Sequence, residues 1–281
     1  MLKINRPRHT AYQTFMKCIS RVKEPKLKLR LKAIAQIVAN TSADLDAAAG
    51  RQELHKLSRD TLVGSGVTKE EMEAVYTQRM AKKNAPGRTI YDELISAPIH
   101  GKCPLCAQRD VTTLDHHLPK AHYPALAVVP LNLIPACGDC NKAKSDRIPL
   151  KAEDVPLHPY FDEIDNERWL LAVMVKTRPA ALRFGVKAPL TWGPILKHRV
   201  RNHFKTLGLA KLYAAESAEE LVNIRYQLID IHDASGAEEV RLHLQERAES
   251  CRRSRRNGWR TAAYEAWAAS DWFCKGGFRA S

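Results

Sequence analysis

The sequence is poor in acidic side chains and contains no long apolar run. Its 281 residues include 31 Asp and Glu against 45 Lys and Arg, which gives a formal net charge of +14. No window holds about 18 uninterrupted apolar residues, so we expect no membrane span. The charged N-terminus is not followed by the apolar segment of a signal peptide. These absences predict a cytoplasmic protein with reduced thiols and no membrane partner.

Positive charge is in excess and is unevenly distributed. Residues 1–32 contain ten Lys or Arg and a single acid, Glu24, whereas residues 251–260 contain five Arg and no acid. A charge of this size favours nucleic acid as the partner over a small metabolite. Helicase, methyltransferase and kinase motifs are missing, and Gly64-Ser-Gly66 lacks the Gly-Lys-Ser/Thr ending of a phosphate loop. We therefore expect no small-molecule cofactor.

Changes in composition divide the chain into residues 1–98, 99–150 and 151–281. The first region is basic and predicted to be helical. A helix is expected between Pro25 and Gly50, because these residues are typical of a helix start and stop. Thr68 and Glu71 form a capping-box pattern, which predicts a second helix ending near residue 83.

The third region combines a predicted β-hairpin with helices. Two apolar runs, residues 169–175 and 181–186, are separated by Lys-Thr-Arg-Pro, which is typical of a hairpin. The pattern is helical from Pro194 to about Trp272, with an expected break at residues 233–236. Trp267, Trp272 and Phe273 are interpreted as core residues.

The middle region holds two Cys-x-x-Cys pairs. Cys103 and Cys106 form the first, and Cys137 and Cys140 form the second, with thirty residues between the two pairs. Two such pairs can complete a tetrahedral metal site, so we predict a structural Zn²⁺ with four thiolate ligands. A redox pair or unrelated core cysteines are the alternatives. Gly138 suits a turn of the second pair that requires positive φ.

Polar residues lie between the two pairs in a set order. Residues 111–114 read as a short strand with Asp115 and His116 at its end, and residues 132–136 lead into the second pair. A helix should begin around Asn141. A strand–loop–strand–helix unit this small buries little core, so we expect the metal to replace the missing hydrophobic stability.

These motifs resemble the HNH endonuclease family, the ββα-metal nucleases, and in particular stand-alone bacterial or phage HNH proteins. The resemblance covers residues 103–147 and rests on Cys103-x-x-Cys106, Asp115-His116-x-x-Pro119, Asn132-Leu133 and Cys137-x-x-Cys140-Asn141-x-x-Lys144. It implies that Asp115 binds the catalytic metal, that His116 is the general base, and that Asn132 holds the loop and orients His116. Asn141 stands where many members carry a third His that binds the metal.

The residue types also suit phosphodiester hydrolysis by themselves. Histidine can activate water near neutral pH. The carboxylate of Asp115 and the amide of Asn141 are hard oxygen ligands, which favours catalytic Mg²⁺ or Mn²⁺. The alternative is that Asp115 and His116 merely pair on a strand surface. His117 should point to the opposite face of the strand from His116, and is interpreted as a packing or supporting group.

Several basic residues are candidates for nucleic-acid binding. Near the cysteine pairs these are Lys120, Lys142 and Lys144, and towards the C-terminus they are Arg252, Arg253, Arg255 and Arg256. Such side chains hold phosphates in many complexes, but each could equally be an ordinary solvated cation. Trp259 could stack on a base or belong to the core.

We therefore predict a mainly α-helical α+β protein, with a central zinc-clamped ββα-metal nuclease module, helical N- and C-terminal regions and a short β-hairpin. The predicted function is metal-dependent endonucleolytic hydrolysis of DNA, duplex rather than single-stranded, with one nick per monomer. Anti-phage defence or a mobile element is the expected context, with proteins of a defence system as further partners. The alternatives are a non-catalytic zinc module that binds nucleic acid within a larger complex, and a ribonuclease or a nuclease active only on single strands.

Overall fold

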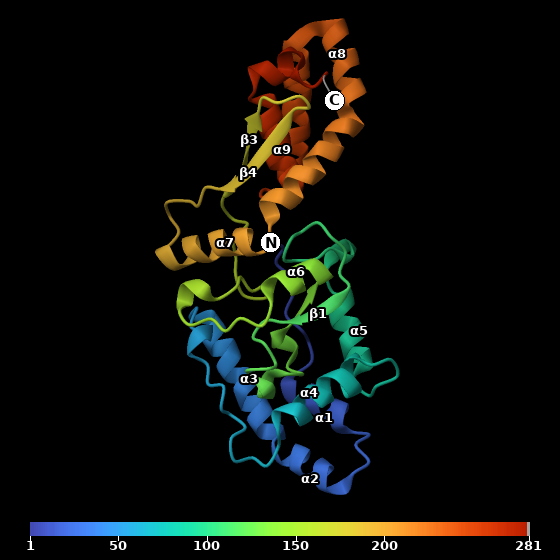
Figure 1. The fold of residues 1–281 in the computed structure, drawn as a ribbon, viewed down its shortest axis with the longest axis vertical. Helices are drawn as coiled ribbons and strands as arrows, with labels where there is room; N and C mark the ends of the chain where they lie inside the picture. Colours follow the sequence, from blue (N-terminus) through green and yellow to red (C-terminus); the bar gives the residue numbers. More distant parts are fainter. Residues whose placement is uncertain (280–281) are drawn as a thin grey trace. The chain divides into compact units, whose positions relative to one another are not determined.

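The computed structural model describes residues 1–279 and divides into two compact units (Figure 1). Unit 1 comprises Met1–Glu163, and unit 2 begins at Ile164. The basic N-terminal region and the cysteine-rich region both lie in unit 1, so they form one folded body.

Unit 1 is built mainly from short helices. They are α1 (Ala11–Ile19), α2 (Pro25–Ala33), α3 (Ala35–Gly50), α4 (Lys69–Tyr76), α5 (Arg88–Ser96) and α6 (Gly138–Lys144), with a π-helical turn, η2 (Thr77–Ala81), directly after α4. The predicted capping box is confirmed: the backbone N–H of Glu71 donates to Thr68 Oγ1 at 3.2 Å, and that of Thr68 donates to Glu71 Oε2 at 2.9 Å. The helix predicted from Pro25 to Gly50 is interrupted at Ile34, where α2 ends and α3 begins.

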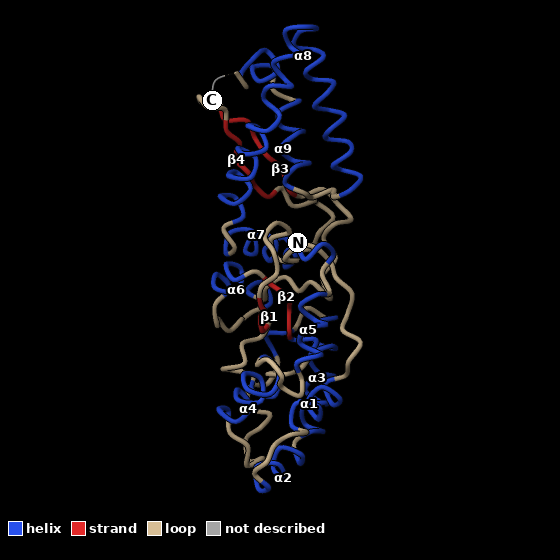
Figure 2. The backbone as a smooth tube through the Cα atoms, turned by 90° about the vertical axis from the view of Figure 1, so that its right-hand side faces the viewer, coloured by secondary structure: helices blue, strands red, loops and turns tan. Residues whose placement is uncertain are grey.

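Two short strands lie beside the helices of unit 1 (Figure 2). They are β1 (Thr113–His116) and β2 (Leu133–Ala136), which pair antiparallel with His116 opposite Leu133. Helix α6 follows β2 almost immediately, so the predicted order of strand, loop, strand and helix is confirmed. The loop between the strands contains two 3₁₀ turns, η4 (Pro124–Leu126) and η5 (Pro130–Asn132).

One hydrophobic core joins this strand–loop–strand segment to the N-terminal helices. Phe15 of α1, Val38 of α3 and Met72 of α4 are fully buried in it together with Val128 and Leu133 from the segment. The strand–loop–strand segment is therefore stabilised by a core that it shares with the N-terminal helices. The sequence had instead predicted that the metal replaces missing hydrophobic stability in this segment.

Unit 2 combines a hairpin with three helices and a final π turn. Its elements are β3 (Leu170–Val175), β4 (Ala181–Val186), α7 (Pro194–Thr206), α8 (Leu209–Ser254), α9 (Trp259–Ala268) and η7 (Phe273–Gly277). The predicted hairpin is confirmed by antiparallel pairing of β3 with β4. The predicted break is confirmed as a kink in α8 at Gly236, whose φ is 82°.

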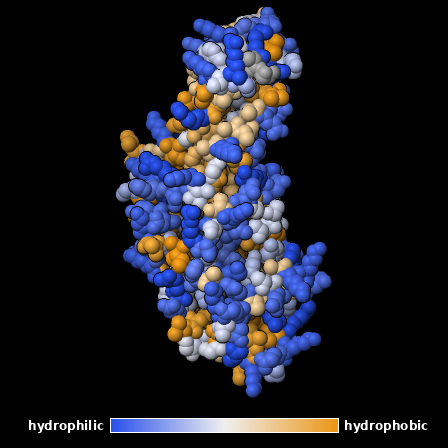
Figure 3. Space-filling view, viewed as in Figure 1, coloured by the Kyte–Doolittle hydropathy of each residue, from blue (hydrophilic) through white to orange (hydrophobic). Residues whose placement is uncertain are grey.

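One face of the hairpin packs on the helices, and the other carries apolar residues at the surface. Leu182 and Phe184 are buried, whereas Val173 is 48% exposed. Apolar residues gather over the hairpin in the space-filling view (Figure 3). Among the described residues, no helix is both long and apolar enough to cross a membrane.

Candidate metal and active site

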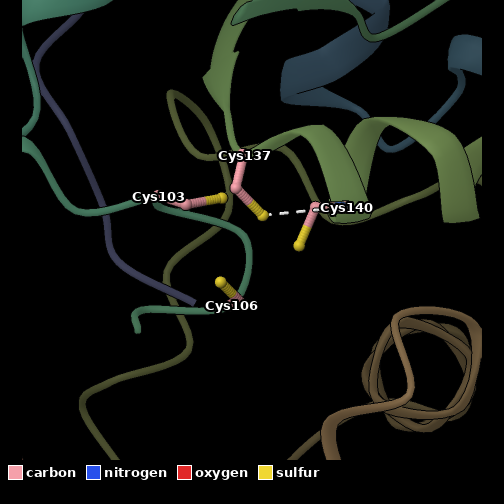
Figure 4. A group of neighbouring side chains, drawn as sticks. All are labelled: Cys103, Cys106, Cys137 and Cys140. Carbon is pink, nitrogen blue, oxygen red and sulfur yellow. Dashed lines mark hydrogen bonds between the residues drawn. The ribbon is translucent and has the colours of Figure 1, made fainter. Parts of the chain in front are cut away.

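The four cysteines of the two Cys-x-x-Cys pairs meet in unit 1. Their sulfur atoms all lie within 4.8 Å of one another, and all four residues are buried. The side chains point towards a common centre (Figure 4). Four thiolates at the usual Zn–S distance of about 2.3 Å would lie about 3.8 Å apart, so this group can hold a metal ion such as zinc.

Backbone N–H groups point at the sulfur atoms. Cys140 N–H donates to Cys137 Sγ at 3.4 Å, and Arg109 N–H donates to Cys106 Sγ at 3.5 Å. Each hydrogen bond stabilises negative charge on sulfur, as thiolate ligands require.

The positive backbone angle expected at Gly138 occurs elsewhere. Gly138 is the first residue of α6, and its N–H donates to Thr112 Oγ1 at 3.1 Å. Ala107, directly after the first cysteine pair, instead has a φ of 57°. The prediction for Gly138 is wrong because the second pair lies at a helix start, where φ is negative.

Next to β1 and α6 lies a pocket of about 320 Å³, here called the unit 1 pocket. Its lining residues are Tyr76, Thr113, Leu114, Asp115, His116, Pro119, Lys120, Ala121, Asn141, Ser145 and Asp146. The pocket thus brings together Asp115, His116 and Asn141, which the sequence places up to 26 residues apart. Neither Asn132 nor His117 lines it.

The environment of His116 fixes which ring nitrogen can act as a base. Nε2 lies 2.8 Å from the backbone oxygen of Ala127. A carbonyl only accepts, so Nε2 carries the proton and Nδ1 is the basic nitrogen. Burial lowers the pKa of His116 to about 3, so the ring is neutral at physiological pH. The ring of Tyr76 packs edge-on against it, with centroids 4.4 Å apart.

Asn132 ties together the two ends of the loop that supports His116. It is fully buried; its Oδ1 accepts from Leu118 N–H at 2.8 Å, and its Nδ2 donates to Leu118 O at 2.9 Å. Nδ2 also lies 3.3 Å from the oxygen of Leu126, the residue before Ala127. Asn132 therefore holds the residue next to Ala127, whose carbonyl contacts His116.

Asp115 has one oxygen paired and one without a partner. Its Oδ1 lies 3.3 Å from Lys144 Nζ, while the buried Oδ2 has no hydrogen-bond partner among the described residues. Burial raises the pKa of Asp115 to about 6. A buried carboxylate oxygen without a partner is costly. Oδ2 and the amide of Asn141 offer hard oxygen donors, which fit Mg²⁺ or Mn²⁺.

Lys144 has a different role from the predicted surface contact with phosphate. The residue is buried, and its ammonium donates to the backbone oxygens of His116 at 2.8 Å and His117 at 3.3 Å. Together with the ion pair to Asp115, these bonds use all three N–H donors. Lys144 thus attaches α6 to the end of β1 and is not available as a solvated cation.

We expect Lys144→Met to destabilise unit 1 by about 3–5 kcal/mol, because it leaves Asp115 as a buried charge without its partner. Urea unfolding measures this loss. Lys142→Met is the matched control: Lys142 is exposed on the same helix, and its substitution should change the free energy of unfolding by less than about 0.5 kcal/mol. Equal effects of the two substitutions would contradict the proposed role of Lys144.

His117 lies in contact with a second histidine outside the unit 1 pocket. Its ring centroid is 4.1 Å from that of His158, and both residues are buried. His158 Nε2 lies 3.1 Å from the backbone oxygen of Leu131. This placement agrees with the interpretation of His117 as a packing residue.

The remaining predicted contacts with nucleic acid differ in environment. Lys120 is half-buried on the unit 1 pocket, and Lys142 is exposed outside it. In unit 2, Arg252 pairs with Glu249 at 2.5 Å and with Glu265 at 2.9 Å. The acids neutralise part of the positive charge on which the prediction rested.

The other arginines of this run also have partners or are partly buried. Arg253 Nε lies 3.0 Å from an oxygen of Glu249, and Arg256 donates to the backbone oxygen of Asn166. Arg255 is half-buried at the end of α8. Trp259 is buried, as the core interpretation requires, and the guanidinium of Arg260 lies over its ring. DNA binding by this run stays a prediction.

Sequence reasoning missed two groups at the site. Tyr76 contacts His116 across 40 residues of sequence, and its hydroxyl lies 3.3 Å from the oxygen of Leu114. The carbonyl of Ala127 selects the histidine tautomer. Neither group has a local sequence signal, because a tyrosine in a helix and a backbone oxygen in a loop occur in many contexts.

Neither a family model nor a solved structure matches this chain. It is similar to a curated protein, protein ea31 of Escherichia phage lambda, with 37% identity over 175 residues. The match covers 60% of this chain and 58% of that protein, so the chain spans less than two thirds of the relative.

Proposed function

We propose that the chain is a metal-dependent endonuclease that hydrolyses DNA phosphodiester bonds in the unit 1 pocket. The observation that carries this proposal is the meeting of Asp115, His116 and Asn141 in one pocket on a strand–loop–strand–helix segment. A four-cysteine site closes the same segment. A simple zinc clamp would need none of the three pocket residues.

In this proposal each residue has a defined task. His116 Nδ1 takes a proton from water, whose oxygen attacks phosphorus while the bond to the 3′-oxygen breaks, and the leaving 3′-oxygen takes a proton from solvent water. By the resemblance to HNH nucleases, the products carry 5′-phosphate and 3′-hydroxyl ends. Asp115 and Asn141 would hold Mg²⁺ or Mn²⁺, which when bound neutralises charge on the phosphate and the leaving oxygen. Lys120, which also lines the pocket, would contact a neighbouring phosphate.

Plasmid nicking tests this proposal. The purified chain should relax supercoiled plasmid only with added Mg²⁺ or Mn²⁺, and Asp115→Asn should reduce the rate about 100-fold or more. Asp60→Asn, at an exposed position of the same unit, is the control. Binding of plasmid without nicking under all metal conditions would favour a non-catalytic zinc module. Faster cleavage of a matched RNA would favour a ribonuclease.

The proposed biological setting rests on the similarity to a phage protein. The similarity to a protein of phage lambda is compatible with a phage or other mobile element, or with defence against one. One proposed active site per chain implies one nick per binding event, so a double-strand break would require two chains or two encounters. Proteins of a defence system are the partners that this setting suggests.

A further inference from the structure

Unit 2 contains a second pocket, of about 590 Å³, here called the unit 2 pocket. It lies between the turn of the β3–β4 hairpin and the C-terminal turn η7. Its lining residues are Arg178, Trp272, Lys275, Gly276, Gly277 and Arg279. Half of these residues are cations, and none of the described lining residues is acidic. A concave site with this composition suits an anionic ligand that also has a flat apolar part.

The indole of Trp272 is held in place by the two glycines of η7. A Cβ atom on Gly277 would lie 2.7 Å from Cε3 and Cζ3 of Trp272, so the glycine backbone lies directly against the six-membered ring. Gly276 has a φ of 108°, which side chains rarely adopt. Trp272 is half-buried, whereas Phe273 is fully buried. The prediction of a core position is thus met by Phe273 but not by Trp272.

The cations around Trp272 differ in how far they are already paired. Arg178 and Lys275 are exposed, and their side chains form no ion pair among the described residues. Arg279 pairs with Asp233, and it also lies 3.1 Å from His232 Nδ1. Arg279 is therefore oriented by its partners, while Arg178 and Lys275 keep their full charge available to a ligand.

We propose that the unit 2 pocket binds an unpaired nucleotide of a nucleic-acid strand. The base stacks on Trp272, and its phosphate lies between Arg178 and Lys275. Aromatic side chains bind bases of any sequence by stacking, and cations along the groove hold the backbone. A purely acidic peptide would use the cations but would leave the indole without a partner. The proposal goes beyond hydrolysis, because the site lies outside the unit 1 pocket and needs no catalytic metal.

Binding of a fluorescent oligothymidylate, measured by anisotropy without added divalent cation, tests the stacking contact. Trp272→Leu should weaken binding roughly 5- to 150-fold, the range measured for removal of one stacked base. Trp272→Phe keeps an aromatic ring in the same position and should restore most of the affinity. An oligonucleotide with abasic positions should bind the unmodified protein as weakly as the intact oligonucleotide binds Trp272→Leu.

A salt series tests the binding of phosphate. The double variant Arg178→Ala, Lys275→Ala should lower the slope of log affinity against log salt by about 0.7 for each phosphate of a single strand that is no longer neutralised. The matched control is Lys187→Ala with Lys211→Ala, which removes two exposed charges from the same unit. An equal decrease of affinity in both double variants would show that only net charge matters, and would overturn the proposal.

The source of the nucleotide is resolved by competition. If free thymidine monophosphate displaces the oligonucleotide and inorganic phosphate does not, the pocket binds a nucleotide through the proposed contacts. The nucleotide can then be free or part of a strand. Resistance to the mononucleotide supports a strand as the ligand, provided that Trp272→Leu still weakens binding. Equally tight binding of the abasic oligonucleotide or of polyglutamate overturns the proposal. Plasmid nicking is measured separately, so loss of one activity is distinguishable from loss of the other.

Discussion

Replacing His116 with alanine should reduce plasmid nicking by about 10²–10⁴-fold, the usual contribution of a positioned general base. The reason lies in the tautomer: the Ala127 carbonyl keeps the proton on Nε2, so Nδ1 is the nitrogen left to accept a proton from water in the proposed reaction. Burial disfavours the charged imidazolium, so Nδ1 carries no proton before the reaction. The fold and the metal content should not change, because His116 does not belong to the four-cysteine group.

Two measurements separate the loss of a base from a loss of structure. Added imidazole should restore part of the nicking rate of His116→Ala, since a small base can enter the space that the ring occupied. Thermal unfolding should show a folded protein. His117→Ala is the matched control, because this neighbour packs on His158 outside the unit 1 pocket. Full activity in His116→Ala together with abolished activity in His117→Ala would show that the assignment is wrong by one residue.

Features that depend on neighbouring residues were predictable from the sequence. The capping box at Thr68, the hairpin of unit 2 and the kink at Gly236 each follow from patterns within a few residues. The four cysteines were predicted to converge because each pair has the spacing of a metal knuckle. Residues close together in the sequence determine these features. Contacts with distant residues therefore left each of them as predicted.

Features that depend on distant contacts were not predictable. Lys144 looks like any lysine of a short basic helix, yet it is buried beneath the end of β1 with Asp115. Trp272 resembles its buried neighbours, yet it lines a pocket because the backbone of Gly277 covers only part of its ring. Burial of a single side chain follows from the full packing of the chain, which residue type and spacing do not determine.

The role of the metal follows from where the core lies. The sequence suggested that zinc replaces a missing core, but Val128 and Leu133 pack with the N-terminal helices in one continuous core. The cysteines lie at the opposite ends of this segment, in the turn after Lys102 and at the start of α6. Metal binding should therefore stabilise the ends of the segment more than its centre.

Cys137→Ser should accordingly lose the metal and loosen the region around the cysteines, while the helical core of unit 1 stays folded. The unmodified protein should carry about one zinc per chain. In the variant, amides of residues 102–112 and 137–144 should exchange with solvent about 100-fold faster or more, because metal binding and folding are coupled in such sites. Elemental analysis and hydrogen exchange measure the two effects.

Cys18→Ser is the control for this substitution. Cys18 is also a buried cysteine of unit 1, but it lies in α1, outside the four-cysteine group. Burying its new hydroxyl should cost about 1–3 kcal/mol without any loss of zinc. A Cys137→Ser protein that keeps its zinc, or exchanges at the same rate as the Cys18→Ser protein, would exclude these four thiolates as a structural metal site. Global unfolding of unit 1 would instead show that the metal supports the whole core, as the sequence alone suggested.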